Sequence, residues 1–366
     1  MLVPMHQLTR YHLDVPWDTH AGILKLGAPT LVEVCIDIRF DTTPWPESFQ
    51  IIDFPGSFEN IFSYNAGIDA FDMANVYSNR LAEDILGHTI KQHKLPRDKI
   101  VIMTKLFCPL SRDPTEFLYE SCEILEGKGY VNQHRLSCKH IFDSVQHSLH
   151  RLRLNYIDVL QCTFCHRFDP DTPIKETMQA LHDVLKAGYV RYVSMSSCYA
   201  WRFHAMQNYA INNKSTPFIS MQNRYNMLCR EEEHKMFPTL KHFGVRAIPW
   251  SPLARGALTR PLERQQQTKH GTSDRMPPGL YTQSDANQTI VNQQATQTDL
   301  IEEIVKKRGS VAPVSVAWTL GKEGVSAPIV GTTSLSNLAD ILAAIHIKLT
   351  EEEIKYLEEP YQPVGH

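Results

Sequence analysis

Short apolar runs alternate with amphipathic segments along most of the chain after residue 67. The runs have the length of β-strands, and in the segments between them apolar residues recur every three or four positions, the spacing of a helix packed on one face. We expect strands at 68–72, 100–105, 156–161, 190–195, 217–222, 245–250 and 326–330, with an eighth within 30–38. Helices are expected at 80–93, 138–153, 174–187, 199–211, 231–242 and 299–308, and a further helix is expected to begin near Leu335. This alternation is typical of a parallel sheet, and the strand count predicts a (β/α)8 TIM barrel, an α/β fold.

Turn and cap residues support three of the helix boundaries. Pro173 follows Asp171-Thr172 at a first-turn position, and Gly188 stands where the same helix should end. Another helix should begin at the run Arg230-Glu231-Glu232-Glu233, because acidic residues in a first turn complement the helix dipole.

Two segments depart from the pattern. Pro55-Gly56 lies in the middle of 47–66, where the first barrel helix should be, and a proline inside a helix costs about 3 kcal/mol. Either that helix is interrupted or its boundaries differ, so residues 1–66 fit the prediction least well. Residues 261–298 are rich in Gln, Thr and Ser and predict a long loop after the seventh strand. The loop either folds over a ligand or is a disordered insertion, and both interpretations stay open.

Composition narrows the class of protein. At 366 residues, the chain is long enough for one barrel with insertions, so we expect a single domain over 1–366. The 37 Lys and Arg against 40 Asp and Glu give no positive footprint for nucleic acid, and no apolar run is long enough for a membrane span. The 8 cysteines do not form a disulfide scaffold in a chain of this length, and we expect a cytoplasmic protein. The sequence leaves the oligomeric state open.

Polar residues follow nearly every predicted strand. Buried parallel strands need only apolar residues for packing, so a polar residue at each carboxyl end calls for another explanation. In a barrel these ends meet around one mouth, where the active sites of this architecture lie. The residues are Asp72, Lys105, His166, Ser196, Ser197, Gln222, Ser251 and Gly331.

Four residues from three successive strand ends predict acid catalysis on a carbonyl group. Tyr77 is the acid: a tyrosine normally loses its proton near pH 10, and a nearby ammonium such as Lys105 favours the tyrosinate. Asp72 would hold the ammonium, and the imidazole of His166 would orient the carbonyl oxygen. Taken singly, Asp72 could cap a turn, Lys105 could be a solvated strand end and Tyr77 a rim aromatic.

Other histidines and cysteines admit simpler readings. Cys162, Cys165 and His166 form C-x-x-C-H, which is the signature of haem attachment or part of a metal site, but two buried or rim thiols are the favoured interpretation. We therefore expect no metal. His140, His147 and His150 share a predicted helix with Arg151 and Arg153, which we interpret as a solvated face.

Seven stretches, in order between Gly67 and Pro360, resemble the aldo-keto reductase family. They are FDMANVYSNRLAED (71–84), RDKIVIMTK (97–105), HSLHRLRLNYIDVLQ (147–161), MSSCYAW (195–201), SMQNRYN (220–226), PWSPLARG (249–256) and APIVGTTS (327–334). Within the family the chain most resembles fungal aryl-alcohol dehydrogenases and reductases of polyketide-type carbonyl compounds. The resemblance implies a (β/α)8 barrel that transfers hydride from NADPH to an aldehyde or ketone.

The resemblance also implies a role for each matching residue. Tyr77 would be the proton donor, Lys105 and Asp72 would tune it, and His166 would orient the substrate. The positions matching the family's cofactor site are Ser196, Ser197 and Gln222 for the nicotinamide carboxamide, Trp250 for stacking on the nicotinamide ring, Ser251, Pro252, Leu253, Gly256, Leu258 and Arg260 for the pyrophosphate, and Gly331, Thr333, Asn337 and Asp340 for the adenosine end. No G-x-G-x-x-G follows a strand, which agrees with a site other than a Rossmann site.

The chain departs from the family pattern at several positions. Met73, Arg80 and Ser194 replace a threonine and two glycines that are usual there, and a lost glycine risks a strained turn. Three extra residues, Thr163 to Cys165, precede His166 and displace it from the strand end. An alternative function is therefore a weakly active or regulatory cofactor-binding barrel that resembles the potassium-channel β subunits.

Overall fold

A ring of parallel strands forms the centre of the computed structural model, which describes residues 32–34, 55–113, 118, 122–162, 169, 171–259, 297, 299–304, 310–332 and 334–363. The strands are β1 (Val32–Val34), β2 (Ala70–Asp72), β3 (Val101–Leu106), β4 (Ile157–Cys162), β5 (Val190–Ser196), β6 (Ser220–Gln222), β7 (Arg246–Ala247) and β8 (Ile329–Val330). Their order is β7-β6-β5-β4-β3-β2-β1-β8, and isolated bridges from Ala247 to Val325 and from Trp250 to Ile329 join the two ends. The fold is therefore the predicted (β/α)8 barrel.

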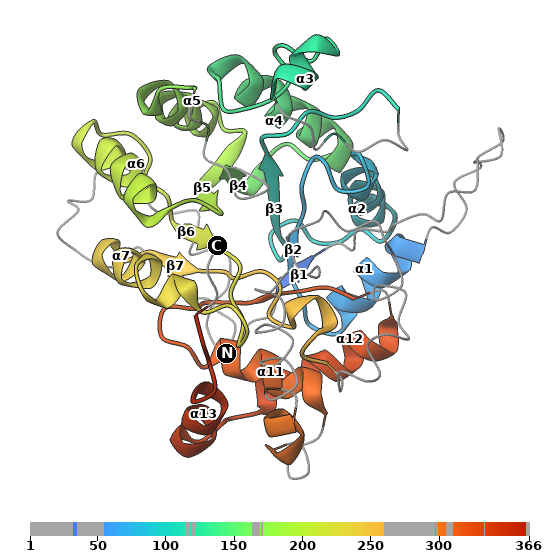
Figure 1. The fold of residues 1–366 in the computed structure, drawn as a ribbon. Helices are drawn as coiled ribbons and strands as arrows, with labels where there is room; N and C mark the ends of the chain where they lie inside the picture. Colours follow the sequence, from blue (N-terminus) through green and yellow to red (C-terminus); the bar gives the residue numbers. More distant parts are fainter. Residues whose placement is uncertain are drawn as a thin grey trace.

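Helices surround the strands (Figure 1). They are α1 (Pro55–Asn65), α2 (Leu81–Gln92), α3 (Cys122–Gly127), α4 (Cys138–Leu152), α5 (Ile174–Lys186), α6 (Ala200–Asn212), α7 (Met236–Phe243), α11 (Val311–Leu320), α12 (Leu335–Leu342) and α13 (Glu351–Glu358), with 3-10 turns η2 (Glu231–Glu233), η3 (Ala254–Gly256) and η4 (Ala343–His346). Each predicted strand and helix contains an observed element, including helical residues at 299–304. The prediction did not include α3, α11 and α13.

Two boundaries show how proline and glycine act. The helix expected over 47–66 begins at Pro55, a position that suits proline because a first-turn N–H has no helical partner to lose. Gly188, with φ of +80°, follows the end of α5 as predicted. Gly87 of α2 allows a close approach instead, because a Cβ there would lie 2.4 Å from the carbonyl oxygen of Arg151 on α4. Helices α2 and α4 pack this closely only because residue 87 has no side chain.

Two apolar cores lie on the two faces of the strands. Phe71, Ile102, Leu160 and Val193 belong to the larger core, which the helix side chains complete. A smaller core of Ala70, Met103, Val159, Ile248, Ala327 and Ile329 lies on the other face of the strands, inside the barrel. Since strand side chains on one face recur every two residues, Asp72, Lys105 and Gln161 stand directly above this apolar layer, toward the carboxyl ends. The polar layer at the mouth therefore rests on a layer of buried apolar side chains.

The face of α4 that we expected to be solvated is partly buried, so that expectation was wrong for two residues. Arg151 is buried, and its charge is compensated because its Nε lies 2.7 Å from Oε2 of Glu83, a fully buried carboxylate on α2. His140 is also buried, and desolvation lowers its pKa to about 4. His147 and His150 are exposed, as expected.

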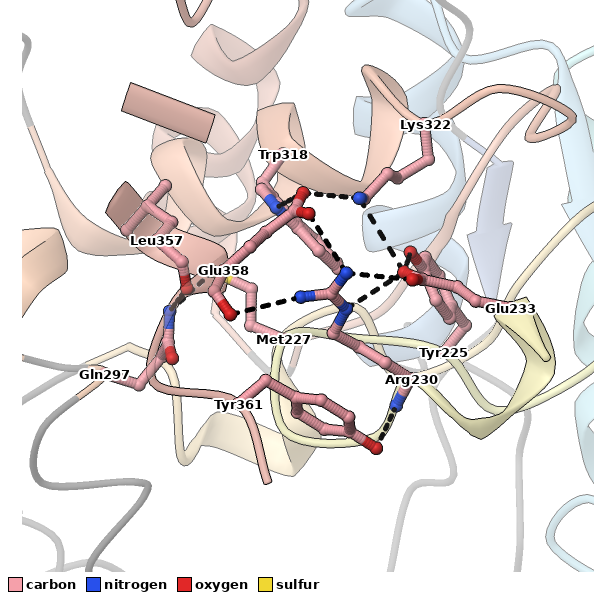
Figure 2. Close-up of polar contacts among 10 residues, drawn as sticks. All are labelled: Tyr225, Met227, Arg230, Glu233, Gln297, Trp318, Lys322, Leu357, Glu358 and Tyr361. Carbon is pink, nitrogen blue, oxygen red and sulfur yellow. Dashed lines mark hydrogen bonds and ion pairs between the residues drawn. The ribbon is translucent and has the colours of Figure 1, made fainter. Parts of the chain in front are cut away.

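A network of charged and aromatic side chains ties the C-terminal helix to the barrel, and we call it the C-terminal clasp (Figure 2). Its residues are Arg230, Glu233, Lys322, Glu358 and Tyr361. The Arg230 guanidinium lies 2.8 Å from Glu233 and 3.0 Å from Glu358, Lys322 also donates to Glu358, and the Arg230 backbone N–H donates to the Tyr361 hydroxyl. The acidic run after Arg230 thus makes specific ion pairs in addition to opening the short turn η2. The clasp joins α13 to α11 and to the connection that follows β6.

Candidate active site

The structure brings three of the four predicted catalytic residues together. Asp72 ends β2, Lys105 lies in β3, and Tyr77 follows β2 in the connection to α2. The Lys105 ammonium donates to Asp72 Oδ2, to the Met73 carbonyl oxygen at 3.0 Å and to the Tyr77 hydroxyl at 3.2 Å. An ammonium has three N–H groups, so each has an acceptor. His166 lies outside the described residues.

Burial controls the electrostatics of this group. The side chains of Lys105 and Asp72 are 2% and 1% exposed. Desolvation lowers the pKa of Lys105 from its ordinary value of 10.5, and the attraction of Asp72 opposes that shift. The Lys105 nitrogen also lies 5.0 Å from the centre of the Tyr77 ring. The site therefore holds a desolvated cation against the hydroxyl that is the candidate acid.

Asp72 is held from its other side by two amides. Gln161 Nε2 donates to Asp72 Oδ1 at 2.5 Å, and Gln222 Nε2 donates to the same oxygen at 3.0 Å. Gln222 was predicted to contact the cofactor, whereas Gln161 was assigned to no site. The available signal for Gln161 was its position as a polar residue near the carboxyl end of β4, two residues after the apolar Val159 and on the same face of the strand.

The backbone after Tyr77 is strained. Ser78, Asn79 and Arg80 have φ values of +47°, +47° and +82°, in the left-handed region that disfavours residues with a Cβ. The buried side chain of Asn79 pins this turn: its Nδ2 donates to the carbonyl oxygens of Ser111 and Asp113 at 3.2 and 2.8 Å, and its Oδ1 accepts from the Ser111 N–H at 3.1 Å. The loop that carries Tyr77 is thereby fixed to the loop that follows Lys105.

The strained turn makes Arg80→Gly a stabilising substitution. Glycine adopts a φ of +82° without the steric cost that arginine bears, and this gain exceeds the entropy that glycine adds to the unfolded chain. We expect the free energy of unfolding, measured by urea denaturation, to rise by about 1 kcal/mol. The control is Lys91→Gly, at an exposed helical position within α2, which should lower the free energy of unfolding by about 1 kcal/mol. Equal effects of both substitutions would contradict the strain.

The four residues predicted to hold the nicotinamide lie at adjacent strand ends. The Ser196 hydroxyl donates to the carbonyl oxygen of Gln222 at 2.9 Å, which links the ends of β5 and β6. Ser197 has a φ of +49°, and its N–H donates to Asn223 Oδ1 at 3.0 Å. Trp250 is half-buried and follows β7, and its backbone N–H donates to the Asn223 carbonyl oxygen. These residues place two hydroxyls, an amide and an aromatic ring at neighbouring strand ends.

The predicted pyrophosphate loop follows Trp250 and contains several strained residues. Its members Ser251, Pro252, Leu253, Gly256 and Leu258 surround the turn η3, where Ser251, Ala254 and Arg255 have φ values of +55°, +48° and +58°. Strained backbone of this kind concentrates at ligand sites. Leu258 is fully buried and its carbonyl oxygen accepts from Ser315, so its side chain belongs to the core. Arg260 lies outside the described residues.

The predicted adenosine segment begins after β8. Gly331 and Asn337 are exposed, and the Ser334 hydroxyl caps α12 by accepting from the Asn337 N–H at 3.4 Å. Asp340 is exposed in α12 and accepts a hydrogen bond from the Ser310 hydroxyl at 2.5 Å. Thr333 lies outside the described residues. The exposed glycine and the capped helix start fit an anionic group.

Of the residues in the C-x-x-C-H segment that were considered as ligands, the structure describes only Cys162. Cys162 is buried on the helix-facing side of β4, and burial raises the pKa of its thiol. Cys165 lies outside the described residues with His166. Where side chains are described, no three His, Cys, Asp or Glu residues are grouped to hold a metal ion.

No described helix combines the length and the apolar character that crossing a membrane requires.

Comparison with known proteins gives one consistent answer. A model described as the aldo/keto reductase family matches residues 62–362. A Schizosaccharomyces pombe protein named "Putative aryl-alcohol dehydrogenase" is 42% identical over 307 residues, which cover 82% of this chain and 90% of that protein. The versiconal hemiacetal acetate reductase of Aspergillus parasiticus is 40% identical over 304 residues, 82% of this chain and 85% of that protein. With this match over most of its length, and with the barrel described above, the chain belongs to the aldo/keto reductase family.

Proposed function

We propose that this protein uses NADPH to reduce an aldehyde or ketone to the alcohol, with Tyr77 as the proton donor. The observation that carries the proposal is the hydrogen bond of 3.2 Å between the Lys105 ammonium and the Tyr77 hydroxyl, in a site where Lys105 is buried and paired with Asp72. A buried cation beside a phenol lowers the cost of forming the phenolate. Proton donation by such a group is general-acid catalysis.

In the proposed reaction, the carbonyl carbon would receive the hydride that NADPH supplies when it is bound. The carbonyl oxygen takes the proton of the Tyr77 hydroxyl, and the Lys105 ammonium, held by Asp72, stabilises the tyrosinate that remains. His166 would orient the carbonyl oxygen. Ser196, Ser197, Gln222 and Trp250 would hold the nicotinamide. The loop 251–260, with Gly331, Thr333, Asn337 and Asp340, would bind the rest of the cofactor.

The relatives suggest a substrate class. The names of the relatives refer to an aryl alcohol and to a versiconal hemiacetal acetate, so we propose an aromatic or polyketide-derived carbonyl compound. We also propose a cytoplasmic location, which agrees with the absence of disulfides among the described cysteines Cys108, Cys138, Cys162, Cys198 and Cys229.

Activity separates this proposal from the alternative of a regulatory cofactor-binding barrel. We expect steady-state oxidation of NADPH, followed by its absorbance, when aromatic aldehydes and polyketide-type ketones are added as a panel. A protein that binds NADPH but oxidises it no faster with any carbonyl compound than without one would support the regulatory alternative.

The expected preference for NADPH over NADH comes from the 2′-phosphate, which only NADPH carries. We expect NADPH to bind at least about tenfold more tightly than NADH, because the 2′-phosphate would meet the start of α12 after Gly331 and a cation at Arg260, and charge-assisted contacts contribute about 1.5–3 kcal/mol. Fluorescence titration with both cofactors measures the difference. Arg260→Met should reduce it, while Arg246→Met, an exposed arginine on β7, should leave it unchanged. Equal dissociation constants for the two cofactors would refute the preference.

A further inference from the structure

Gln161 occupies the centre of the polar layer, and no motif or comparison gives it a role. Its side chain is fully buried, its Cα is paired with Lys105 on β3 and Ser194 on β5, and its Nε2 donates to Asp72 Oδ1 at 2.5 Å. Asp72 in turn accepts from Lys105 through its other oxygen, Oδ2. Gln161 is therefore two hydrogen bonds away from the ammonium that contacts Tyr77.

The oxygen of the Gln161 amide makes glutamine an unfavourable residue at a position that serves only packing. Gln161 Oε1 is buried and has no hydrogen-bond partner among the residues that the structure describes. A buried acceptor without a partner lowers stability, and an apolar residue of the same length would fill the space without that loss. The orientation of the amide is nevertheless fixed, because only its nitrogen can face a carboxylate. Packing alone does not explain a residue that is half unsatisfied and aimed at Asp72.

We propose that Gln161 is a positioning residue: its amide holds the Asp72 carboxylate in the orientation that keeps Lys105 against Tyr77. The inference rests on the proposed function, since it concerns the group that would donate the proton. Gln222 donates to the same oxygen of Asp72 at 3.0 Å. The carboxylate therefore accepts hydrogen bonds from Gln161 on β4, from Gln222 on β6 and from Lys105 on β3. Without Gln161, the carboxylate loses its shorter amide contact and its freedom to rotate away from Lys105 increases.

Few charged groups surround Gln161, so a change in the pH dependence of kcat can be assigned to a substitution at this residue. In the described part of the site, those facing Gln161 are Asp72 on β2 and Lys105 on β3, with the Tyr77 hydroxyl beyond them. The neighbouring strands present Ser194 and Ser196 from β5 and Gln222 from β6, which do not titrate. Glu83 acts on Lys105 from the helix side of β3.

Two substitutions of nearly equal size test the proposal. Gln161→Met removes the donor but keeps the length, and we expect kcat to fall about tenfold, with the Kd for NADPH unchanged and the melting temperature no lower than that of the parent. In Gln161→Glu the introduced carboxyl can donate to Asp72 only when protonated, and its pKa is raised because two carboxylates meet there. We expect kcat close to the parent value at low pH and a loss of activity as the carboxyl ionises, an ionisation that the parent profile lacks.

The matched control is Gln179 on the surface of α5, whose Nε2 donates to Asp183 Oδ1 at 2.8 Å. Gln179→Met and Gln179→Glu make the same chemical changes away from the site and should leave kcat and its pH profile unaltered. Parental kcat in Gln161→Met together with a parental pH profile in Gln161→Glu would overturn the proposal. So would losses that follow the melting temperature in both variants, because they indicate packing alone. Failure of the proposed function is recognised separately, by an active Tyr77→Phe variant.

Discussion

Replacing Tyr77 by phenylalanine is expected to lower kcat for carbonyl reduction by about 10²- to 10⁴-fold, the usual contribution of a general acid. The substitution removes only the hydroxyl, which lies 3.2 Å from the Lys105 nitrogen, and retains the ring. Binding of NADPH should be nearly unchanged, because the proposed cofactor contacts come from other strand ends. Single-turnover oxidation of NADPH measures the chemical step, and fluorescence titration measures the affinity.

A hydroxyl elsewhere provides the control for this experiment. Tyr356 on α13 is exposed, and its hydroxyl donates to Glu303 at 2.7 Å. Tyr356→Phe therefore removes a hydrogen-bonded hydroxyl without touching the site and should keep parental activity. If Tyr77→Phe retains most of the parental rate, Tyr77 is not the proton donor and the proposed mechanism is wrong.

The second large effect concerns the buried ion pair. Lys105→Met removes the cation and leaves Asp72 as a buried carboxylate with two amide donors, so we expect the free energy of unfolding to fall by about 3–5 kcal/mol. Activity should be lost as well, because the tyrosinate has no counter-charge. Without its cation, Asp72 takes up a proton more readily, so the variant should regain stability relative to the parent as the pH falls.

The double variant Lys105→Met/Asp72→Asn separates the two losses. It contains no unpaired buried charge, so most of the stability should return, whereas carbonyl reduction should remain absent. Urea unfolding at several pH values and NADPH oxidation measure the two properties. A double variant as unstable as Lys105→Met would mean that lost packing, and not the isolated carboxylate, causes the instability.

The parts of this structure that depend on local sequence could be predicted. Strand length, helical spacing and a residue such as Gly188 act within a few positions, and the resemblance to a known family placed Asp72, Tyr77 and Lys105 in one site. Even the broken pattern at Pro55 had a local cause, since the proline turned out to begin the helix. The strain at Arg80 was likewise expected from a missing glycine.

Contacts between distant residues could not be predicted in this way. Arg151 looked solvated because its partner, Glu83, lies 68 residues earlier in the chain and only the packing of α2 on α4 brings them together. Gln161 looked like an ordinary strand residue because its meaning depends on a carboxylate 89 positions away. No spacing rule connects such pairs. The predicted roles of His166, Arg260 and Thr333 stay predictions, as does that of the loop 261–298.

The C-terminal clasp can form only after nearly the whole chain has been synthesised. Arg230 and Glu358 are 128 residues apart, and β1 pairs with β8, so both the clasp and the ring need the last part of the chain. Contacts of such high sequence separation slow folding, and until they form, β1 and β8 present unpaired edges. A nascent chain that has not reached residue 330 lacks β8 and is therefore an open, aggregation-prone sheet, and its yield in cells should depend on chaperones that shield the unpaired edges until β8 has been made.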